Sequence, residues 1–305
     1  MDNVIETNGL TKRYGDVVAL DDVSVTVRRG DIFGVVGDNG AGKTTLFKLL
    51  CGLAFPTAGE LRLLGAHEPR EVERQRARVG SIIESPGFYP NLSVERNLEC
   101  CRIQKGVPGK EAVGRLLEEV GLAYAKDRAC KDLSMGMKQR LGLAMALIGE
   151  PELLILDEPA SGLDPSGIVE MCALLLRLNR ELGITVVVSS HHLAELERMA
   201  TVYAFLNRGR LLEQVSARRL RERCADCIDI AVSDPSAFAV LLERERPGER
   251  YQVLPDGAVR ILDPQAGAEA YSGLASAHGM DVCRLERRTM SLEQYYLEMK
   301  EKGAA

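Results

Sequence analysis

The sequence predicts an α/β fold, with a mostly parallel β-sheet covered by helices, followed by a smaller α+β domain. Short apolar runs without polar alternation support the first part, at residues 31–37, 79–84, 152–158 and 184–190. Such runs are typical of strands buried on both faces of a parallel sheet, and segments with helical spacing lie between them. A different order of expected strands and helices from residue 226 onwards supports the second domain.

The elements of the first part follow one another regularly. The run at 31–37 ends in glycine and precedes leucines that recur at helical spacing, namely Leu46, Leu49, Leu50 and Leu53. Amphipathic patterns predict the later helices, over 110–120, 136–148 and 165–182. Residues 17–30 alternate between apolar and polar side chains, which predicts an antiparallel strand at the edge of the parallel sheet.

The second part begins after a hairpin that turns at 207–209 and an arginine-rich linking helix over 216–224. From residue 226 the patterns predict strand, helix, strand, strand, helix, strand and a final helix. The expected segments are 227–233, 236–246, 251–254, 258–262, 268–278, 281–288 and 291–302. The βαββαβ order is that of a ferredoxin-like split βαβ unit. We therefore predict two domains, 1–225 and 226–305.

Composition and charge narrow the possible classes of protein. The chain has 305 residues, 46% hydrophobic and 27% charged, as in an ordinary globular protein. Its net charge of -5 argues against a protein that coats nucleic acid. Because no apolar run reaches the ~18 to 20 residues that span a bilayer, and the first residues do not resemble a signal peptide, we expect a cytoplasmic protein.

The cysteines predict neither a disulfide framework nor a metal site. The 8 cysteines show no scaffold spacing, so we expect reduced thiols. Cys224 and Cys227 form a single C-x-x-C pair, whereas zinc requires two further ligands at suitable spacing. A structural role is therefore the favoured interpretation of this pair.

A phosphate-binding motif joins the first apolar run to the following helix. The stretch "GDNGAGKT", from Gly37 to Thr44, fits G-x-x-x-x-G-K-[ST] between a strand and a helix. Its glycines allow backbone N–H groups to surround phosphate oxygens, Lys43 reaches the β and γ phosphates, and the Thr44 hydroxyl is a ligand for Mg²⁺. A glycine-rich structural turn is the alternative, but a turn needs neither the lysine nor the threonine.

A carboxylate pair ends another apolar run. Asp157 and Glu158 follow "LLIL", at the carboxyl end of a buried strand where ligands collect in open α/β sheets. An aspartate in this position holds Mg²⁺ in P-loop ATPases, and the adjacent glutamate is suited to polarise the attacking water as a general base. The alternative is a carboxylate pair that merely caps the next helix.

These motifs, in this order, resemble the nucleotide-binding subunit of ABC transporters over about residues 3–215. The resemblance implies a P-loop NTPase of the ABC type, with an antiparallel β edge and a helical subdomain, that binds ATP and Mg²⁺. It implies an ATP site formed by Tyr14, Asp38, Asn39, Gly40, Ala41, Gly42, Lys43, Thr44, Thr45, Ser134 and Gly136. It assigns catalytic roles to Lys43, Glu158 and His191, and metal binding to Thr44, Glu84 and Asp157. Residues 161–164 match the D-loop, and Tyr14 the aromatic residue that stacks on adenine.

The stretch "LSMGM", residues 133–137, corresponds to the family's signature, normally LSGGQ. The resemblance implies that Ser134, Gly136 and the start of the next helix contact the γ-phosphate bound by a second subunit. Met135 and Met137 replace a glycine and a glutamine, which lowers the polarity but leaves the serine and the second glycine in place. Each half site is then incomplete alone.

Position 84 is the second departure from the family. Glu84 stands where the family carries the Q-loop glutamine that senses Mg²⁺ and the catalytic water. A carboxylate also offers an oxygen but adds charge. Both departures resemble the branch of exporter ATPases associated with bacitracin resistance and lantibiotic immunity.

The adjacent histidines have a structural alternative. Neighbouring residues point about 100° apart on a helix, so His191 and His192 cannot form an i, i+4 metal pair. A lone histidine is usually a surface or packing residue, but its place after a strand favours a γ-phosphate role for His191.

The sequence thus predicts the ATP-hydrolysing subunit of an ABC transporter, a homodimer or heterodimer formed with ATP. Because we expect no membrane span, the resemblance implies a separate transmembrane permease, a place at the inner face of the membrane and export of a drug or antimicrobial peptide. A soluble ABC ATPase acting on ribosomes or DNA is the alternative, but it usually carries two nucleotide domains or a long coiled-coil insertion. No guanine-binding NKxD motif supports a GTPase, and we expect no nucleic-acid partner.

Overall fold

The computed structural model describes residues 2–224, 226–262, 264–288 and 291–302. The described residues divide into two compact units, Met1–Ala217 and Arg218–Ala305. The boundary lies earlier than the predicted one at 225, because helix α8 (Ala217–Cys224) belongs mostly to the second unit. There, Arg223 donates a hydrogen bond to the hydroxyl of Tyr295 in helix α11 (Leu292–Lys302).

The first unit is built on a predominantly parallel sheet. Its strands are, in spatial order, β10 (Arg210–Ser216), β9 (Val202–Asn207), β4 (Ile32–Val36), β8 (Thr185–Ser190), β7 (Leu153–Asp157) and β6 (Val79–Ile82). Strand β10 pairs antiparallel with β9, and the other neighbouring pairs are parallel. Every residue of β4, β7 and β8 is buried, which explains their continuous apolar character and confirms the predicted parallel sheet.

The N-terminal strands form a separate antiparallel sheet, so the expectation that residues 17–30 extend the parallel sheet is wrong. Strands β1 (Asn3–Tyr14), β2 (Val17–Val23), β3 (Thr26–Arg28) and β5 (Ala58–Leu63) make up this sheet. Its neighbour is the edge strand β10, where Gln214 accepts a hydrogen bond from the backbone N–H of Thr26. A shared apolar core, to which Leu20, Phe33 and Phe47 contribute, explains why the two sheets stay distinct layers.

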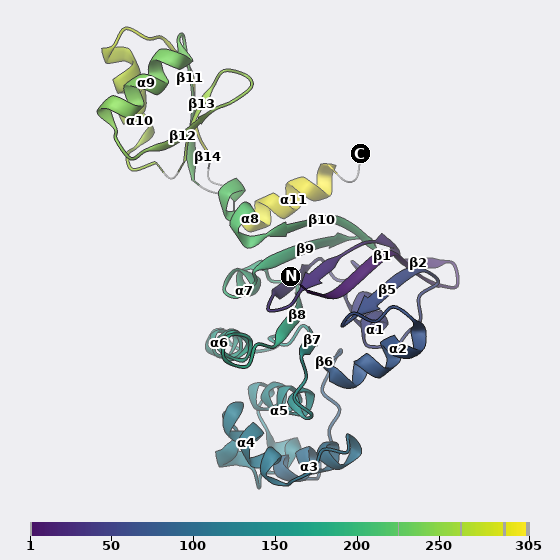
Figure 1. The fold of residues 1–305 in the computed structure, drawn as a ribbon. Helices are drawn as coiled ribbons and strands as arrows, with labels where there is room; N and C mark the ends of the chain where they lie inside the picture. Colours follow the sequence, from purple (N-terminus) through teal and green to yellow (C-terminus); the bar gives the residue numbers. More distant parts are fainter. Residues whose placement is uncertain (1, 225, 263, 289–290, 303–305) are drawn as a thin grey trace. The chain divides into compact units, whose positions relative to one another are not determined.

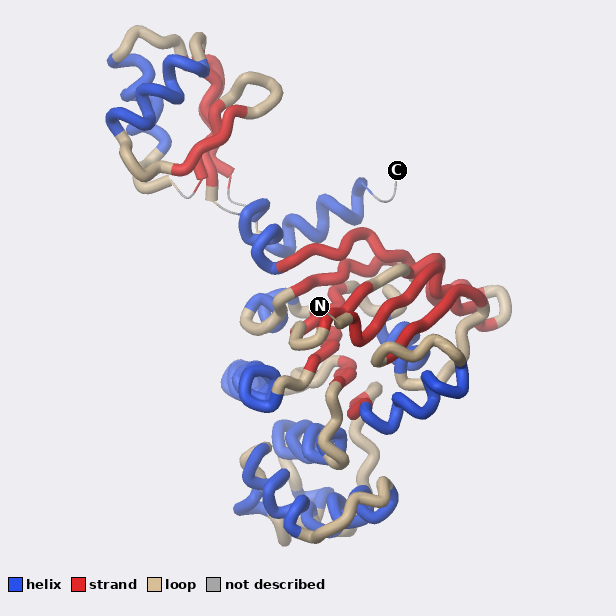
Figure 2. Tube along the Cα trace, in the orientation of Figure 1, coloured by secondary structure: helices blue, strands red, loops and turns tan. Residues whose placement is uncertain are grey.

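Helices cover the parallel sheet and extend beyond it (Figures 1 and 2). The helices of this unit are α1 (Lys43–Leu50), α2 (Pro69–Gln75), α3 (Val94–Gln104), α4 (Glu111–Glu119), α5 (Met135–Leu147), α6 (Pro165–Leu182) and α7 (Leu193–Glu197), with short 3₁₀ turns at Arg76–Arg78, Ala123–Ala125 and Cys130–Asp132. Helices α3, α4 and α5 contact one another, and α5 also contacts β6. This group is the helical subdomain.

The second unit has the ferredoxin-like arrangement predicted from its βαββαβ order. Its antiparallel strands lie in the order β12 (Arg250–Val253), β13 (Val259–Leu262), β11 (Cys227–Val232) and β14 (Val282–Arg288). Helices α9 (Pro235–Glu245) and α10 (Ala268–Ala277) bury Phe238 and Tyr271 in a core with the sheet. Asp229 is 1% exposed and pairs with Arg260 through two contacts of 2.7 Å.

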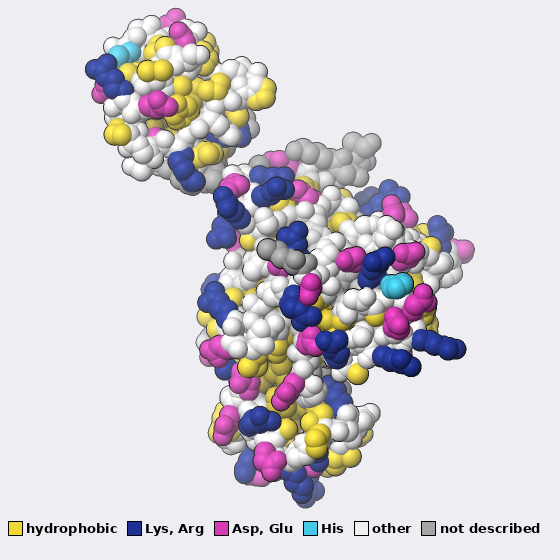
Figure 3. Space-filling view, viewed as in Figure 1, with side chains coloured by type: hydrophobic (Ala, Val, Ile, Leu, Met, Phe, Trp, Pro, Cys, Tyr) yellow, Lys and Arg dark blue, Asp and Glu magenta, His cyan; other side chains and the backbone are white. Residues whose placement is uncertain are grey.

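The surface charges and the lengths of the helices show how the described residues meet their surroundings. On the face shown in Figure 3, Lys and Arg side chains are interspersed with Asp and Glu side chains over the described residues. Such a mixed surface is typical of a solvated protein face. Within the residues that the structure describes, none of the helices combines the length and the apolarity needed to cross a bilayer.

Candidate functional site: a phosphate-binding loop and its carboxylates

The loop between β4 and α1 is shaped by its glycines. Gly40 and Gly42 have φ values of 83° and 107°, in the left-handed region that favours glycine. A Cβ atom at Gly37 would lie 2.7 Å from the carbonyl oxygen of Leu206, and one at Gly42 would lie 2.8 Å from that of Ala19. The loop can therefore pass close to neighbouring backbone only with glycine at these positions. It ends at the N-terminus of α1, where unpaired N–H groups favour an anion.

Lys43 is held inside this loop. Lys43 is 5% exposed, and its Nζ donates hydrogen bonds to the carbonyl oxygens of Gly37 at 2.6 Å and Asp38 at 3.3 Å. The same Nζ lies 3.3 Å from Oε1 of Glu158. The first residue of α1 thus places a positive charge between the loop and the carboxylate after β7.

Asp157 joins three neighbouring elements through hydrogen bonds. Its Oδ2 accepts a hydrogen bond from the Thr44 hydroxyl at 2.7 Å, and its Oδ1 accepts one from the Ser189 hydroxyl at 2.6 Å. Ser189 lies opposite Asp157 in the β7–β8 register and also accepts a hydrogen bond from the Glu158 N–H at 2.9 Å. Ser189 is not among the site residues predicted from the sequence. It lies at the end of the apolar run 184–190, and ligand-binding side chains collect at such strand ends.

Glu158 and His191 form a close pair. His191 Nδ1 lies 2.6 Å from Glu158 Oε2, so a protonated Nδ1 donates to the carboxylate. The buried Oε1 of Glu158 has no hydrogen-bond partner among the described residues and lies 3.3 Å from Lys43 Nζ. Glu158 has a φ of 51°, an uncommon value for a non-glycine residue that is found at active sites. The geometry thus fixes Oε2 through His191 and leaves Oε1 with an ion pair to Lys43 but no hydrogen bond within the described part of the chain.

Tyr14 lies at the β1–β2 hairpin, close to the loop. Tyr14 is 48% exposed, and Lys12 Nζ lies 4.9 Å from the centroid of the tyrosine ring. Strand β2 contributes Ala19, which approaches Gly42, so the hairpin borders the phosphate-binding loop. An accessible aromatic ring at this border is suited to stacking on a flat base.

Glu84, the third residue of the predicted metal set, contacts helix α1, whereas Asp157 accepts hydrogen bonds from Thr44 and Ser189. The Glu84 carboxylate contacts Lys48, with an Oε1–Nζ distance of 2.7 Å, and its side chain is 64% exposed. The hydrogen bond with Glu84 is the main reason why the pKa of Lys48 lies above its usual value, and Asp157 contributes a smaller attraction. Among the described residues, no group of three or more His, Cys, Asp and Glu side chains is placed to hold a metal ion.

The stretch 133–137 surrounds the start of α5. Ser134 is the N-cap residue, and its hydroxyl accepts a hydrogen bond from the Met137 N–H at 3.3 Å. Ser134 and Gly136 line a cavity of about 620 Å³ together with Gly162 and Asp164 of the loop before α6. All the lining residues belong to 121–170, so the chain's own phosphate-binding loop does not contribute to this cavity.

The fold and the loop geometry define a P-loop NTPase: a phosphate cradle begins α1, and a carboxylate ends the adjacent buried strand. The family model described as "ABC transporter" matches residues 20–161. The chain is 40% identical to the bacitracin transport ATP-binding protein BcrA of Enterococcus faecalis, over 98% of this chain and 97% of the relative. It is 39% identical to the lantibiotic transport ATP-binding protein SrtF of Streptococcus pyogenes, over 68% of this chain and 89% of that protein.

A solved structure of cbiO1 from Clostridium perfringens, described as part of the ABC transporter complex cbiONQ, has the same fold. It covers 81% of this chain and 97% of its own, with a TM-score of 0.67 and 25% identity. The chain belongs to the ATP-binding proteins of ABC transporters. It is therefore an ATP-binding, ATP-hydrolysing transporter subunit, and the alternative of a ribosome- or DNA-directed ATPase is not favoured.

Proposed function

We propose that this subunit powers the export of bacitracin-like or lantibiotic peptides through a separate transmembrane permease, at the cytoplasmic face of the membrane. The observation that carries the proposal is the 40% identity to a bacitracin transport protein, which extends over 98% of this chain and so includes both units. The lantibiotic relative supports the same substrate class.

A strain that lacks this subunit is expected to become more sensitive to bacitracin or to a lantibiotic, by about fourfold or more in inhibitory concentration. Complementation with the wild-type gene should restore resistance, whereas a Lys43→Ala gene should not, because the buried ammonium that neutralises phosphate charge is lost. An antibiotic with an intracellular target serves as the control. Unchanged sensitivity to both peptide classes would contradict the proposed substrate.

We infer that ATP binds with its phosphates in the loop at residues 37–45 and its adenine on Tyr14. The loop's glycines allow backbone N–H groups of residues 38–45 to surround the phosphates, and Lys43 would exchange its contacts with loop carbonyls for phosphate oxygens. Tyr14 stacks on the base from the neighbouring hairpin. The left-handed glycines of the loop and the exposed ring of Tyr14 support this arrangement.

Mg²⁺ fits the same site. Thr44 and Asp157 form a hydroxyl–carboxylate pair at 2.7 Å beside the loop, and oxygen atoms of this kind are the ligands that Mg²⁺ prefers. Bound Mg²⁺ would neutralise charge on the β and γ phosphates. Thr44 would bind it directly, and Asp157 would be held in orientation by Ser189. Glu84, whose carboxylate contacts Lys48 here, would have to move toward the ion to contribute.

Glu158 then acts on the attacking water. Its Oε1, which accepts no hydrogen bond from the described residues, accepts the water proton once Lys43 turns to the phosphate, while His191 holds Oε2 and so fixes the direction of the carboxylate. The distance of 3.3 Å between Oε1 and Lys43 Nζ supports a position of this oxygen near the expected γ-phosphate. His191 is thus positioned to support both Glu158 and the phosphate.

The cavity at residues 134–136 supports dimer formation with ATP. Because the chain's own phosphate-binding loop does not line it, Ser134 and Gly136 are available to a γ-phosphate held by another subunit. That subunit is a second copy or a related chain, as a homodimer or heterodimer. ATP completes the contact between two half sites.

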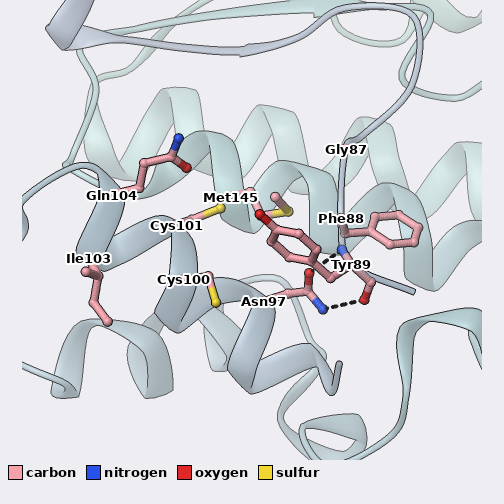
Figure 4. Close-up of a pocket in the computed structure, with 9 residues that line it drawn as sticks. All are labelled: Gly87, Phe88, Tyr89, Asn97, Cys100, Cys101, Ile103, Gln104 and Met145. Carbon is pink, nitrogen blue, oxygen red and sulfur yellow. Dashed lines mark hydrogen bonds between the residues drawn. The ribbon is translucent and has the colours of Figure 1, made fainter. Parts of the chain in front are cut away.

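The permease is proposed to contact a groove on the helical subdomain. The groove has a volume of about 600 Å³ and includes the exposed side chains of Tyr89 and Ile103 (Figure 4). Asn97, which is 1% exposed, holds the backbone of Tyr89 in place at one side of the groove. Its side chain accepts a hydrogen bond from the Tyr89 N–H at 2.7 Å and donates one to the Tyr89 carbonyl at 3.1 Å. A rigid, partly apolar groove beside the Glu84 loop is suited to a short segment of a membrane partner.

Glu84→Gln is expected to keep or raise the rate of ATP hydrolysis. The substitution retains an oxygen ligand and removes one negative charge beside the triphosphate. Steady-state hydrolysis by the purified chain measures the effect, with the exposed Glu181→Gln on α6 as a control. A loss of more than about tenfold, roughly 1.4 kcal/mol of barrier, would instead assign the carboxylate itself to metal binding or proton transfer.

A further inference from the structure

An ion pair links the P-loop helix to the loop after β6. Lys48 lies in the last turn of α1, and its Nζ is 2.7 Å from Oε1 of Glu84. The two side chains are 34% and 64% exposed, and ion pairs with this exposure contribute little to folding stability. We therefore expect the ion pair to affect where the Glu84 carboxylate lies and how much net negative charge it adds there, and not the stability of the fold.

The Glu84 loop is also fixed from its other side. Glu84 has a φ of 65°, which a non-glycine residue rarely adopts, so the surrounding contacts must hold this backbone. Pro86 occupies the space above Gly142 of α5, where an added Cβ would lie 2.5 Å from the proline Cγ. The loop thus lies between the helix that begins with Lys43 and the helix that Ser134 caps.

The charge at position 84 needs compensation when ATP is bound. Lys48 belongs to the same helix as Lys43 and Thr44, the first two residues of that helix. An unpaired carboxylate on this loop would add negative charge beside a triphosphate. The Lys48–Glu84 pair has no net charge, so it presents an oxygen without that repulsion.

We propose that Lys48 is a positioning residue for ATP hydrolysis, which neutralises Glu84 and holds its carboxylate beside the nucleotide site. The inference rests on the proposed place of Glu84 near Mg-ATP. It requires a specific dependence: loss of Lys48 is harmful only while position 84 carries a negative charge. Removal of both charges should be tolerated.

The test compares full-length Lys48→Met, Lys48→Arg, Glu84→Gln and the Lys48→Met/Glu84→Gln double variant, with exposed Lys126→Met as a matched control. We expect Lys48→Met to lower kcat/KM for ATP and the affinity for Mg-ATP by about tenfold. Lys48→Arg should retain at least about half of the activity. The double variant should return to within about twofold of Glu84→Gln alone. The thermal midpoint should change by less than about 3 °C in each variant.

Two results would overturn the role of Lys48: a Lys48→Met variant that binds and hydrolyses ATP like the wild type, or a double variant as impaired as Lys48→Met. Binding is measured separately, so the inference does not depend on turnover. If the wild-type chain hydrolyses no ATP but adding Glu84→Gln restores the Mg-ATP affinity that Lys48→Met lost, the two proposals separate. In that case Lys48 still neutralises Glu84 beside the nucleotide, and the proposed motor function fails.

Discussion

Glu158→Gln is expected to lower ATP hydrolysis by about 10² to 10⁴ while ATP binding persists. The amide has nearly the same shape as the carboxylate, and its oxygen can still accept from His191, which lies 2.6 Å from Oε2. It cannot take a proton from water, however, and the free Oε1 loses its function as a base. Lys43, Thr44 and Asp157 are unchanged, so Mg-ATP should bind and remain intact.

Single-turnover hydrolysis and nucleotide binding measure this prediction together. Exposed Glu181→Gln makes the same chemical change away from the site and should behave like the wild type. The intact γ-phosphate should also trap an ATP-bound dimer, which elutes earlier in gel filtration. Hydrolysis at the wild-type rate would exclude Glu158 as the general base.

Ser134→Arg, added to Glu158→Gln, is expected to abolish the ATP-bound dimer. The larger side chain would extend into the cavity of about 620 Å³ and occupy the space that we propose for the partner's γ-phosphate. Because residues of the phosphate-binding loop do not line this cavity, each chain should still bind its own nucleotide. Gel filtration with ATP, together with nucleotide binding by the separated monomer, measures the two effects.

Loss of the helix cap must be separated from loss of the phosphate contact. The Ser134 hydroxyl caps α5, so both Ser134→Arg and Ser134→Ala should lower stability by about 1 kcal/mol. Only the arginine extends into the space proposed for the phosphate, and Ser134→Ala should weaken the dimer without abolishing it. If the Ser134→Arg variant dimerises as well as Glu158→Gln alone, residues 133–137 do not complete a neighbour's site.

Several features of the fold were predictable because they depend on local patterns. Continuous apolar runs identified β4, β7 and β8, since strands buried on both faces admit few polar residues. The order of elements after residue 226 identified the ferredoxin-like unit, because two strand–helix–strand segments joined at the β12–β13 hairpin are the pattern of a split βαβ unit. The N-terminal strands were misplaced, since alternation shows that a strand is half-exposed but not which sheet it joins.

The sequence by itself determined the chemistry of the phosphate-binding loop, because Gly37 to Thr44 are consecutive and their backbone conformation follows from the glycines. It also placed Asp157 and Glu158 at the end of a buried strand. Only the tertiary structure decided that Ser189 orients Asp157 and that Lys48 pairs with Glu84. These contacts join side chains that are distant in the sequence, and they depend on how neighbouring strands align and how a loop packs between two helices.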